Sequence, residues 1–125
     1  MLVGLIRRDD QFHSWAVARA RQLPAPWLTC EAVLSEALFL VGTSGRKEVL
    51  ALLRRGLLRV DFDLAGELSP VLRLLDKYAD VPMSLADACL VRMTEILADP
   101  IVLTTDDDFR IYRRHSRQVV PCMMP

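Results

Sequence analysis

Short apolar stretches that alternate with helical segments are the feature that most constrains the fold of this chain. Apolar and β-branched residues dominate the runs 27–30, 57–62 and 101–104. Runs of this kind between helices favour parallel strands covered on both faces, because a crossover helix connects each strand to the next. We therefore expect an α/β fold with a short, mostly parallel sheet.

Apolar periodicity and terminal signals predict the helices between these strands. The segments expected to be helical are 2–23, 32–41, 46–55, 65–78 and 84–97. A break is expected over 42–45, and Gly56 stands where a C′ glycine would end the third helix. Ser84 and Asp87 have the spacing of a capping box. Beyond the last helix we expect a polar turn at 105–108, a basic helical turn at 109–115 and a last strand at 118–121.

Size and composition limit the classes of protein to consider. A chain of 125 residues fits one domain, and 52% hydrophobic residues exclude overall disorder. Sixteen basic and sixteen acidic residues balance, so any nucleic-acid contact needs a local basic patch. The longest uncharged run, around 38–44, is too short to span a membrane. Three widely spaced cysteines fit a reduced, cytoplasmic protein.

Three acidic residues stand where a parallel sheet would gather functional side chains. Asp106 directly follows the expected strand 101–104, and ligands of such folds bind at the carboxyl ends of strands. Asp87 lies in a first helical turn at the same edge, and Glu36 lies in an otherwise apolar helical stretch. Clustered carboxylates repel one another unless a divalent cation lies between them, and their hard oxygen atoms suit Mg²⁺ or Mn²⁺. Metal-assisted phosphodiester hydrolysis is the corresponding chemistry.

Each acid also has a purely structural interpretation. Asp87 can complete the capping box with Ser84, a role that is compatible with binding a metal. Glu36 can be a solvated residue on a half-exposed helix, and Asp106 can form a turn. Spacing alone leaves these alternatives open.

Three segments together resemble the acid-bearing regions of a known family. Residues 34–38, 77–91 and 102–109 are similar to the second, third and fourth acid regions of PIN-domain proteins, in the right order along the chain. The nearest branch is the VapC ribonuclease toxins of bacterial toxin–antitoxin pairs. The resemblance implies a three-layer α/β/α fold, a Mg²⁺- or Mn²⁺-dependent ribonuclease, a homodimer and a cognate antitoxin protein.

The same resemblance assigns residues to the site. Glu36, Asp87 and Asp106 match the catalytic metal ligands, and Asp108 matches an auxiliary acid. A threonine at 104 or 105 is expected to hydrogen-bond a carboxylate or a phosphate.

The beginning of the chain departs from the family pattern. PIN domains start with a central strand that ends in an aspartate, whereas this sequence starts directly with the segment that matches the following helix. Three explanations compete: a natural start upstream of Met1, a degenerate relative, or replacement of the strand by another segment, for example through exchange in a dimer. Asp9 and Asp10 are poor replacement ligands, because they lie well along that helix.

Basic and aromatic residues follow Asp106 directly. Arg110, Arg113 and Arg114 are candidates to hold RNA phosphates, and Tyr112 is a candidate to stack on a base. A solvated basic turn is the structural alternative.

Three functions remain in competition at this point. The first is a PIN-type endoribonuclease. The second is a non-catalytic or degenerate PIN-like module that acts through dimerisation or antitoxin binding. The third is a Mg²⁺-dependent phosphoesterase with a small-molecule substrate.

Overall fold

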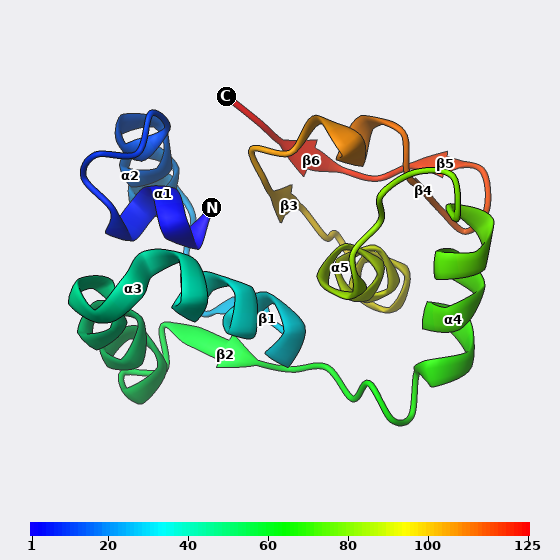
Figure 1. Ribbon diagram of the computed structural model, residues 1–125, viewed down its shortest axis with the longest axis horizontal. Helices are drawn as coiled ribbons and strands as arrows, with labels where there is room; N and C mark the ends of the chain where they lie inside the picture. The colour runs from blue at the N-terminus through cyan, green and yellow to red at the C-terminus, as the bar shows by residue number, and fades with distance from the viewer. The chain divides into compact units, whose positions relative to one another are not determined.

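The computed structural model describes residues 1–125 and divides into two compact units (Figure 1). The first unit comprises Met1–Asp61 with Pro125, and the second comprises Phe62–Met124. Both units contain helices and short strands, and two strand pairs are parallel, so the predicted mixed α/β class is confirmed. The expected single sheet is wrong, because the strands form three separate two-stranded sheets. The single PIN-like domain with three layers stays a prediction.

The first unit begins with two helices where one was expected. Its elements are α1 (Leu2–Ile6), α2 (His13–Gln22), β1 (Trp27–Thr29), α3 (Glu31–Arg54) and β2 (Leu58–Val60). The predicted continuous helix over 2–23 is wrong, because the chain turns between α1 and α2. In that turn, Oδ1 of Asp10 accepts a hydrogen bond from the Phe12 N–H at 2.8 Å. Such local side-chain bonds offer the backbone an alternative to helical pairing.

Helix α3 contains the expected break, but the break is confined to one residue. Gly42 has φ 68° and ψ −169°, whereas the residues on both sides are helical. Gly45 lies inside the helix, where an added Cβ would be only 2.9 Å from Cγ2 of Ile6. A glycine at this position therefore lets α1 pack closely on α3. Gly56, with φ 73°, follows the helix end as predicted.

Strands β1 and β2 form a parallel pair beside α3 (Figure 1). Trp27 pairs with Leu58 and Thr29 pairs with Val60. The two expected strands at 27–30 and 57–62 are thus confirmed in shorter form. The buried apolar side chains of this unit are those of Ala16, Cys30, Ala37, Val41, Val49 and Leu58.

The second unit contains the remaining helices and strands. They are α4 (Leu68–Lys77), α5 (Leu85–Ile96), β3 (Val102–Leu103), the 3₁₀ helix η1 (Asp107–Arg110), β4 (Arg113–Arg114), β5 (Gln118–Val119) and β6 (Cys122–Met123). Strand β3 pairs in parallel with β6, and β4 pairs antiparallel with β5. The expected helix at 84–97 and the expected strand at 101–104 are confirmed. The basic helical turn expected over 109–115 is wrong, because the chain leaves η1 after one turn and enters the β4–β5 hairpin.

Three aromatic rings form the centre of the second unit. The ring of Tyr112 makes edge-to-face contacts with Tyr78 and Phe109, at centroid distances of 5.2 and 5.1 Å. All three residues are buried, and Tyr112 has no exposed surface. This cluster joins the end of α4, the helix η1 and the start of the hairpin.

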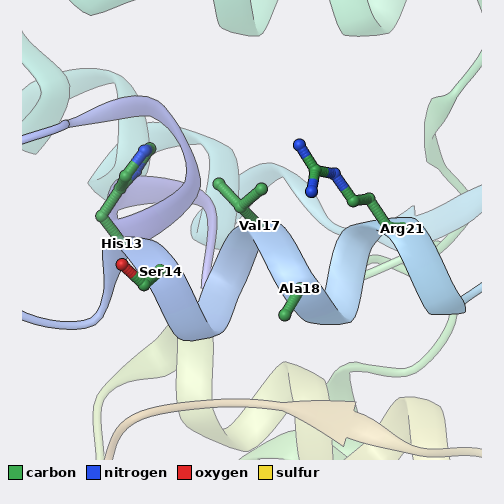
Figure 2. A pocket seen from close by; sticks show the side chains of 5 residues that line it. All are labelled: His13, Ser14, Val17, Ala18 and Arg21. Carbon is green, nitrogen blue, oxygen red and sulfur yellow. The ribbon is translucent and has the colours of Figure 1, made fainter.

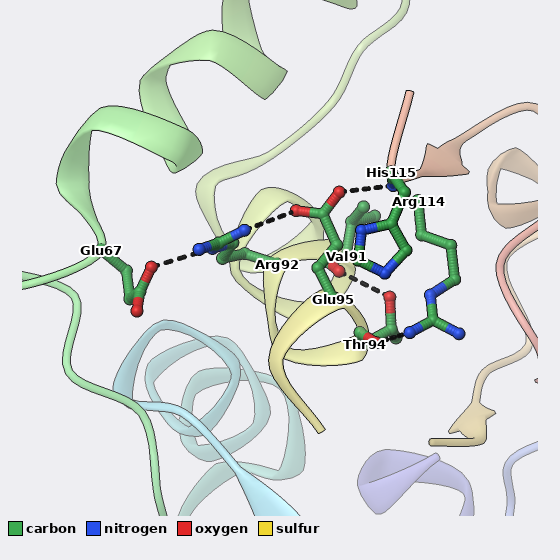
Figure 3. Close-up of polar contacts among 7 residues, drawn as sticks. All are labelled: Glu67, Val91, Arg92, Thr94, Glu95, Arg114 and His115. Atoms are coloured by element: carbon green, nitrogen blue, oxygen red, sulfur yellow. Dashed lines mark hydrogen bonds and ion pairs between the residues drawn. The ribbon is translucent and has the colours of Figure 1, made fainter. Parts of the chain in front are cut away.

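A polar network joins α4, α5 and the hairpin on another side of the same unit (Figure 3). Arg92 bonds to Glu67 and Glu95, and the second oxygen of Glu95 accepts from the His115 N–H. Arg114 donates to the carbonyl oxygen of Thr94. The hairpin is therefore held against α5 by backbone and side-chain contacts together.

None of the helices combines the length and the apolar character that a membrane span requires.

Candidate functional site

Asp87 is fixed by the start of helix α5. The Ser84 hydroxyl accepts a hydrogen bond from the Asp87 N–H at 3.0 Å, and Oδ2 of Asp87 accepts from the Ser84 N–H at 3.3 Å. These two bonds form the predicted capping box. The structural interpretation of Asp87 is confirmed, and its carboxylate is held in place by the backbone.

Tyr112 supplies a further bond to the same carboxylate. Its hydroxyl donates to Oδ2 of Asp87 at 2.9 Å. Burial, followed by the hydrogen bond to Asp87 and the charge of that carboxylate, raises the pKa of Tyr112 far above its usual value. The predicted stacking of Tyr112 on an RNA base is wrong for this structure, because the buried ring has no free face. Its hydroxyl holds an acid instead.

Asp106 and Asp108 lie in the turn that follows β3. The Asp106 N–H donates to the Thr104 hydroxyl at 3.0 Å, and Oδ1 of Asp106 accepts from the Asp108 N–H at 2.9 Å. The predicted turn-forming role of Asp106 is therefore present. Thr104 accepts from a backbone N–H, whereas a bond to a carboxylate or a phosphate was expected of it.

Three of the four predicted acids share one electrostatic neighbourhood within the second unit. Partial burial raises the pKa of the Asp108 carboxyl above its usual value. The negative charges of Asp106 and Asp87, and then that of Asp107, raise this pKa further. Within each unit, no three His, Cys, Asp or Glu side chains converge into a group that could hold a metal ion.

The carboxylate oxygens of these acids are nevertheless of the hard type that divalent cations such as Mg²⁺ prefer. Both side-chain hydrogen bonds to Asp87 fall on Oδ2, and the one to Asp106 falls on Oδ1, so each carboxylate keeps a second oxygen. Asp108 accepts no hydrogen bond and forms no ion pair through its carboxylate, although like charges surround it. Uncompensated carboxylate oxygens of this kind are ligands that Mg²⁺ and Mn²⁺ accept.

Glu36, the fourth predicted ligand, belongs to the first unit. It lies on α3, six positions before Gly42, and its side chain is exposed. This placement agrees with the solvated interpretation of Glu36. Its predicted role as a metal ligand stays a prediction.

The predicted RNA-binding arginines differ in what they are free to do. Arg110 is exposed, and its guanidinium forms an ion pair with Asp107 at 3.2 Å, in which both side chains are largely solvated. In contrast, Nη1 of Arg113 donates to the carbonyl oxygens of Arg110, Ile111 and Tyr112. Arg114 is half-buried and bonds to Thr94. Of these three arginines, Arg110 is therefore the one whose side chain is exposed to solvent.

Sequence reasoning missed the tyrosine pair that organises this site. The hydroxyl of Tyr78 accepts a hydrogen bond from the Arg113 N–H at 2.8 Å. Arg113 directly follows Tyr112, whose hydroxyl donates to Asp87. No local motif signals either bond, because the partners are 35 and 25 residues apart.

A separate surface depression lies on helix α2 (Figure 2). It is lined by residues of this one helix, namely His13, Ser14, Val17, Ala18 and Arg21. Nδ1 of His13 lies 2.8 Å from the Gly4 carbonyl oxygen, within hydrogen-bond distance. None of the predicted site residues takes part in this depression.

Comparison of the chain with protein-family models, with curated proteins and with solved structures found no match.

Proposed function

We propose that this protein is a metal-dependent endoribonuclease of the PIN type, related to the VapC toxins. The observation that supports it is the shared electrostatic neighbourhood of Asp87, Asp106 and Asp108. These acids come from the start of α5 and from the turn after β3, as the resemblance in sequence expects. The three-layer PIN fold is part of the same proposal.

Mutual repulsion among these acids supports a bound cation. Like charges held near one another disfavour ionisation, and after desolvation, which is the largest cause, the charges of Asp106, Asp87 and Asp107 add to the raised pKa of Asp108. A divalent cation would remove this cost, because it compensates the charges of several carboxylates at once. We propose Mg²⁺ or Mn²⁺ bound by Asp87, Asp106 and Asp108.

A bound Mg²⁺ or Mn²⁺ would supply an activated water and charge stabilisation for phosphodiester hydrolysis. The protein's own contribution is to hold the acids. Ser84 and Tyr112 fix Asp87, and the Asp106 carboxylate is fixed by the N–H of Asp108. The exposed guanidinium of Arg110 is the proposed contact for an RNA phosphate.

The same resemblance supports two protein partners. We propose that a second copy of the chain forms a homodimer and that a cognate antitoxin inhibits the enzyme. A cytoplasmic location is part of this proposal.

A non-catalytic PIN-like module is the second candidate function. The structural role of Asp87 favours this module, because its carboxylate completes the cap of α5 and accepts a hydrogen bond from the Tyr112 hydroxyl. Under this alternative the acids serve the fold, and the protein acts through binding to a partner alone.

Cleavage of RNA by the 125-residue chain tests the proposal. We expect cleavage with Mn²⁺ that EDTA abolishes and that Asp108→Asn and Asp106→Asn each reduce strongly. Asp107→Asn is the matched control, because Asp107 lies between these acids but its side chain is 87% exposed and pairs with Arg110. Equal cleavage by all four proteins would contradict the assignment.

Two further measurements separate the alternatives. Asp87→Asn should also abolish cleavage, and its thermal midpoint has to be compared with that of the parent, because Asp87 contributes to the cap. Hydrolysis of small phosphate esters in place of RNA would favour a phosphoesterase. No hydrolysis and no Mn²⁺ binding would favour the non-catalytic module.

A further inference from the structure

We propose that Tyr112 is a positioning residue that orients the Asp87 carboxylate toward the cation, an inference that rests on the proposed function. The sequence placed Tyr112 beside the acids as a base-stacking ring. The structure instead places the Tyr112 hydroxyl on Asp87, to which it donates a hydrogen bond.

Two donors from different parts of the chain meet on one oxygen of Asp87. The Tyr112 hydroxyl lies 2.9 Å from Oδ2, and the Ser84 N–H lies 3.3 Å from the same atom. The carboxylate plane is therefore restrained at Oδ2, and Oδ1 is left as the atom that can bind a cation. Partners that hold a ligating group from behind in this way commonly set metal affinity.

The ring of Tyr112 is packed into the interior of the second unit. The ring is completely buried and contacts Tyr78 and Phe109 edge to face. The next residue is anchored as well, since the Arg113 N–H donates to the Tyr78 hydroxyl at 2.8 Å. Nη1 of Arg113 also binds the Tyr112 carbonyl oxygen at 3.0 Å. Ring and backbone are thus both fixed, which is what a positioning residue requires.

A structural role alone is the competing explanation. A buried tyrosine hydroxyl needs a partner whether or not a function depends on it. Loss of stability in a variant therefore does not distinguish the two explanations, whereas a change in metal affinity does.

The chain offers a matched pair of variants for this purpose. Tyr112→Phe and Tyr78→Phe each remove one buried, hydrogen-bonded hydroxyl from the same aromatic cluster and keep the ring. Only the Tyr112 hydroxyl touches Asp87, because the Tyr78 hydroxyl binds the Arg113 backbone. Both variants should lose stability, but Tyr112→Phe should weaken cation binding far more than Tyr78→Phe.

The primary measurement is the affinity for Mn²⁺ alone, read from the electron paramagnetic resonance signal of free Mn²⁺, with thermal midpoints recorded alongside. We expect Tyr112→Phe to weaken Mn²⁺ binding about tenfold or more. Tyr78→Phe should weaken it much less, because the Tyr78 hydroxyl bonds to the Arg113 backbone and does not touch Asp87. In RNA cleavage, Tyr112→Phe should lower kcat with little change in KM.

Each other outcome has a definite meaning. Mn²⁺ binding that is equal in the parent and in both variants overturns the positioning role but leaves the ribonuclease proposal standing. Equal weakening in both variants also overturns it, because the effect would then follow from the damaged cluster. Absence of Mn²⁺ binding by the parent chain overturns the metal site and the positioning role together.

Discussion

Nε of Arg92 donates to Oε2 of Glu67 at 2.8 Å, and this contact joins helix α5 to the residue that precedes helix α4. The same guanidinium reaches Glu95, whose side chain is only 10% exposed. Arg92→Met removes the charge and keeps most of the apolar stem, so Glu67 loses its ion pair and Glu95 keeps only its hydrogen bond from the His115 N–H. We expect the free energy of unfolding to fall by about 1–3 kcal/mol, measured by urea denaturation. Arg73→Met, at an exposed position on α4, is the control, and a loss of the same size there would contradict this explanation.

Ser84→Ala tests the capping box. The Ser84 hydroxyl accepts a hydrogen bond from the Asp87 N–H, and alanine removes this one of the two capping-box bonds. We expect a loss of about 1 kcal/mol in the free energy of unfolding. Ser69→Ala, at an exposed position in the first turn of α4, should change stability little. The helix cap would be dispensable if both variants unfolded at the same urea concentration.

The confirmed parts of the sequence prediction depend on local signals. Ser84 and Asp87 are three residues apart, and their reciprocal bonds are visible in a motif. Gly56 ends a helix because glycine readily adopts the positive φ that the position after a helix end requires. The parallel pairing of β1 with β2 follows from apolar runs separated by a helix.

The failed parts depend on competition between local preferences or on distant partners. The apolar periodicity of 2–23 gives no sign of the turn between α1 and α2, in which the Asp10 side chain accepts a hydrogen bond from the Phe12 N–H. Arg113 and Arg114 gave no strand signal, yet pairing with β5 and bonds to Tyr78 and Thr94 hold them extended. Of the site, the acids of the second unit could be predicted as neighbours, whereas the Tyr112 bond to Asp87 could not.

Gly42→Ala tests the backbone break in α3. The φ of 68° and ψ of −169° fall in a region that essentially only glycine occupies, and an added Cβ would meet no atom within 4 Å. The cost of alanine is therefore conformational, and we expect a loss of roughly 1–3 kcal/mol in the free energy of unfolding. Ser44→Ala, an exposed helical position nearby, is the control. A more stable Gly42→Ala protein would show that the break is not required.

Arg110→Ala tests the proposed contact with RNA. Its exposed side chain should add one phosphate contact without supporting the fold. We expect weaker RNA binding, and the slope of log K against log salt concentration should become shallower by about 1, as for the loss of one phosphate contact. Arg73→Ala removes an equal charge from α4 and is the control, and an equal effect there would point to non-specific attraction. Arg113→Ala should instead lower the thermal midpoint, since its guanidinium binds three carbonyl oxygens.

Cys122 gives a prediction on pH. Burial raises the pKa of its thiol, and the charge of Arg110 partly offsets that rise. Because the thiolate is the reactive form, alkylation of Cys122 at pH 8 should be slower in the folded chain than in the urea-unfolded chain. Arg110→Ala should slow it further, since the offsetting charge is gone. Peptide mapping by mass spectrometry measures the rate at this cysteine, and a faster reaction in the variant would contradict the assigned cause.

The two kinds of bond on Asp87 have a consequence for the order in which the site assembles. The bonds with Ser84 span three residues, so they can form as soon as the first turn of α5 does. The bond from Tyr112 spans 25 residues and has to wait for β3, η1 and the hairpin to fold against that helix. Closing the longer loop costs more entropy, which delays this contact. Asp87 is therefore oriented first by its own helix and fully restrained only when the second unit is complete, so the proposed acid site is not finished before that unit has folded.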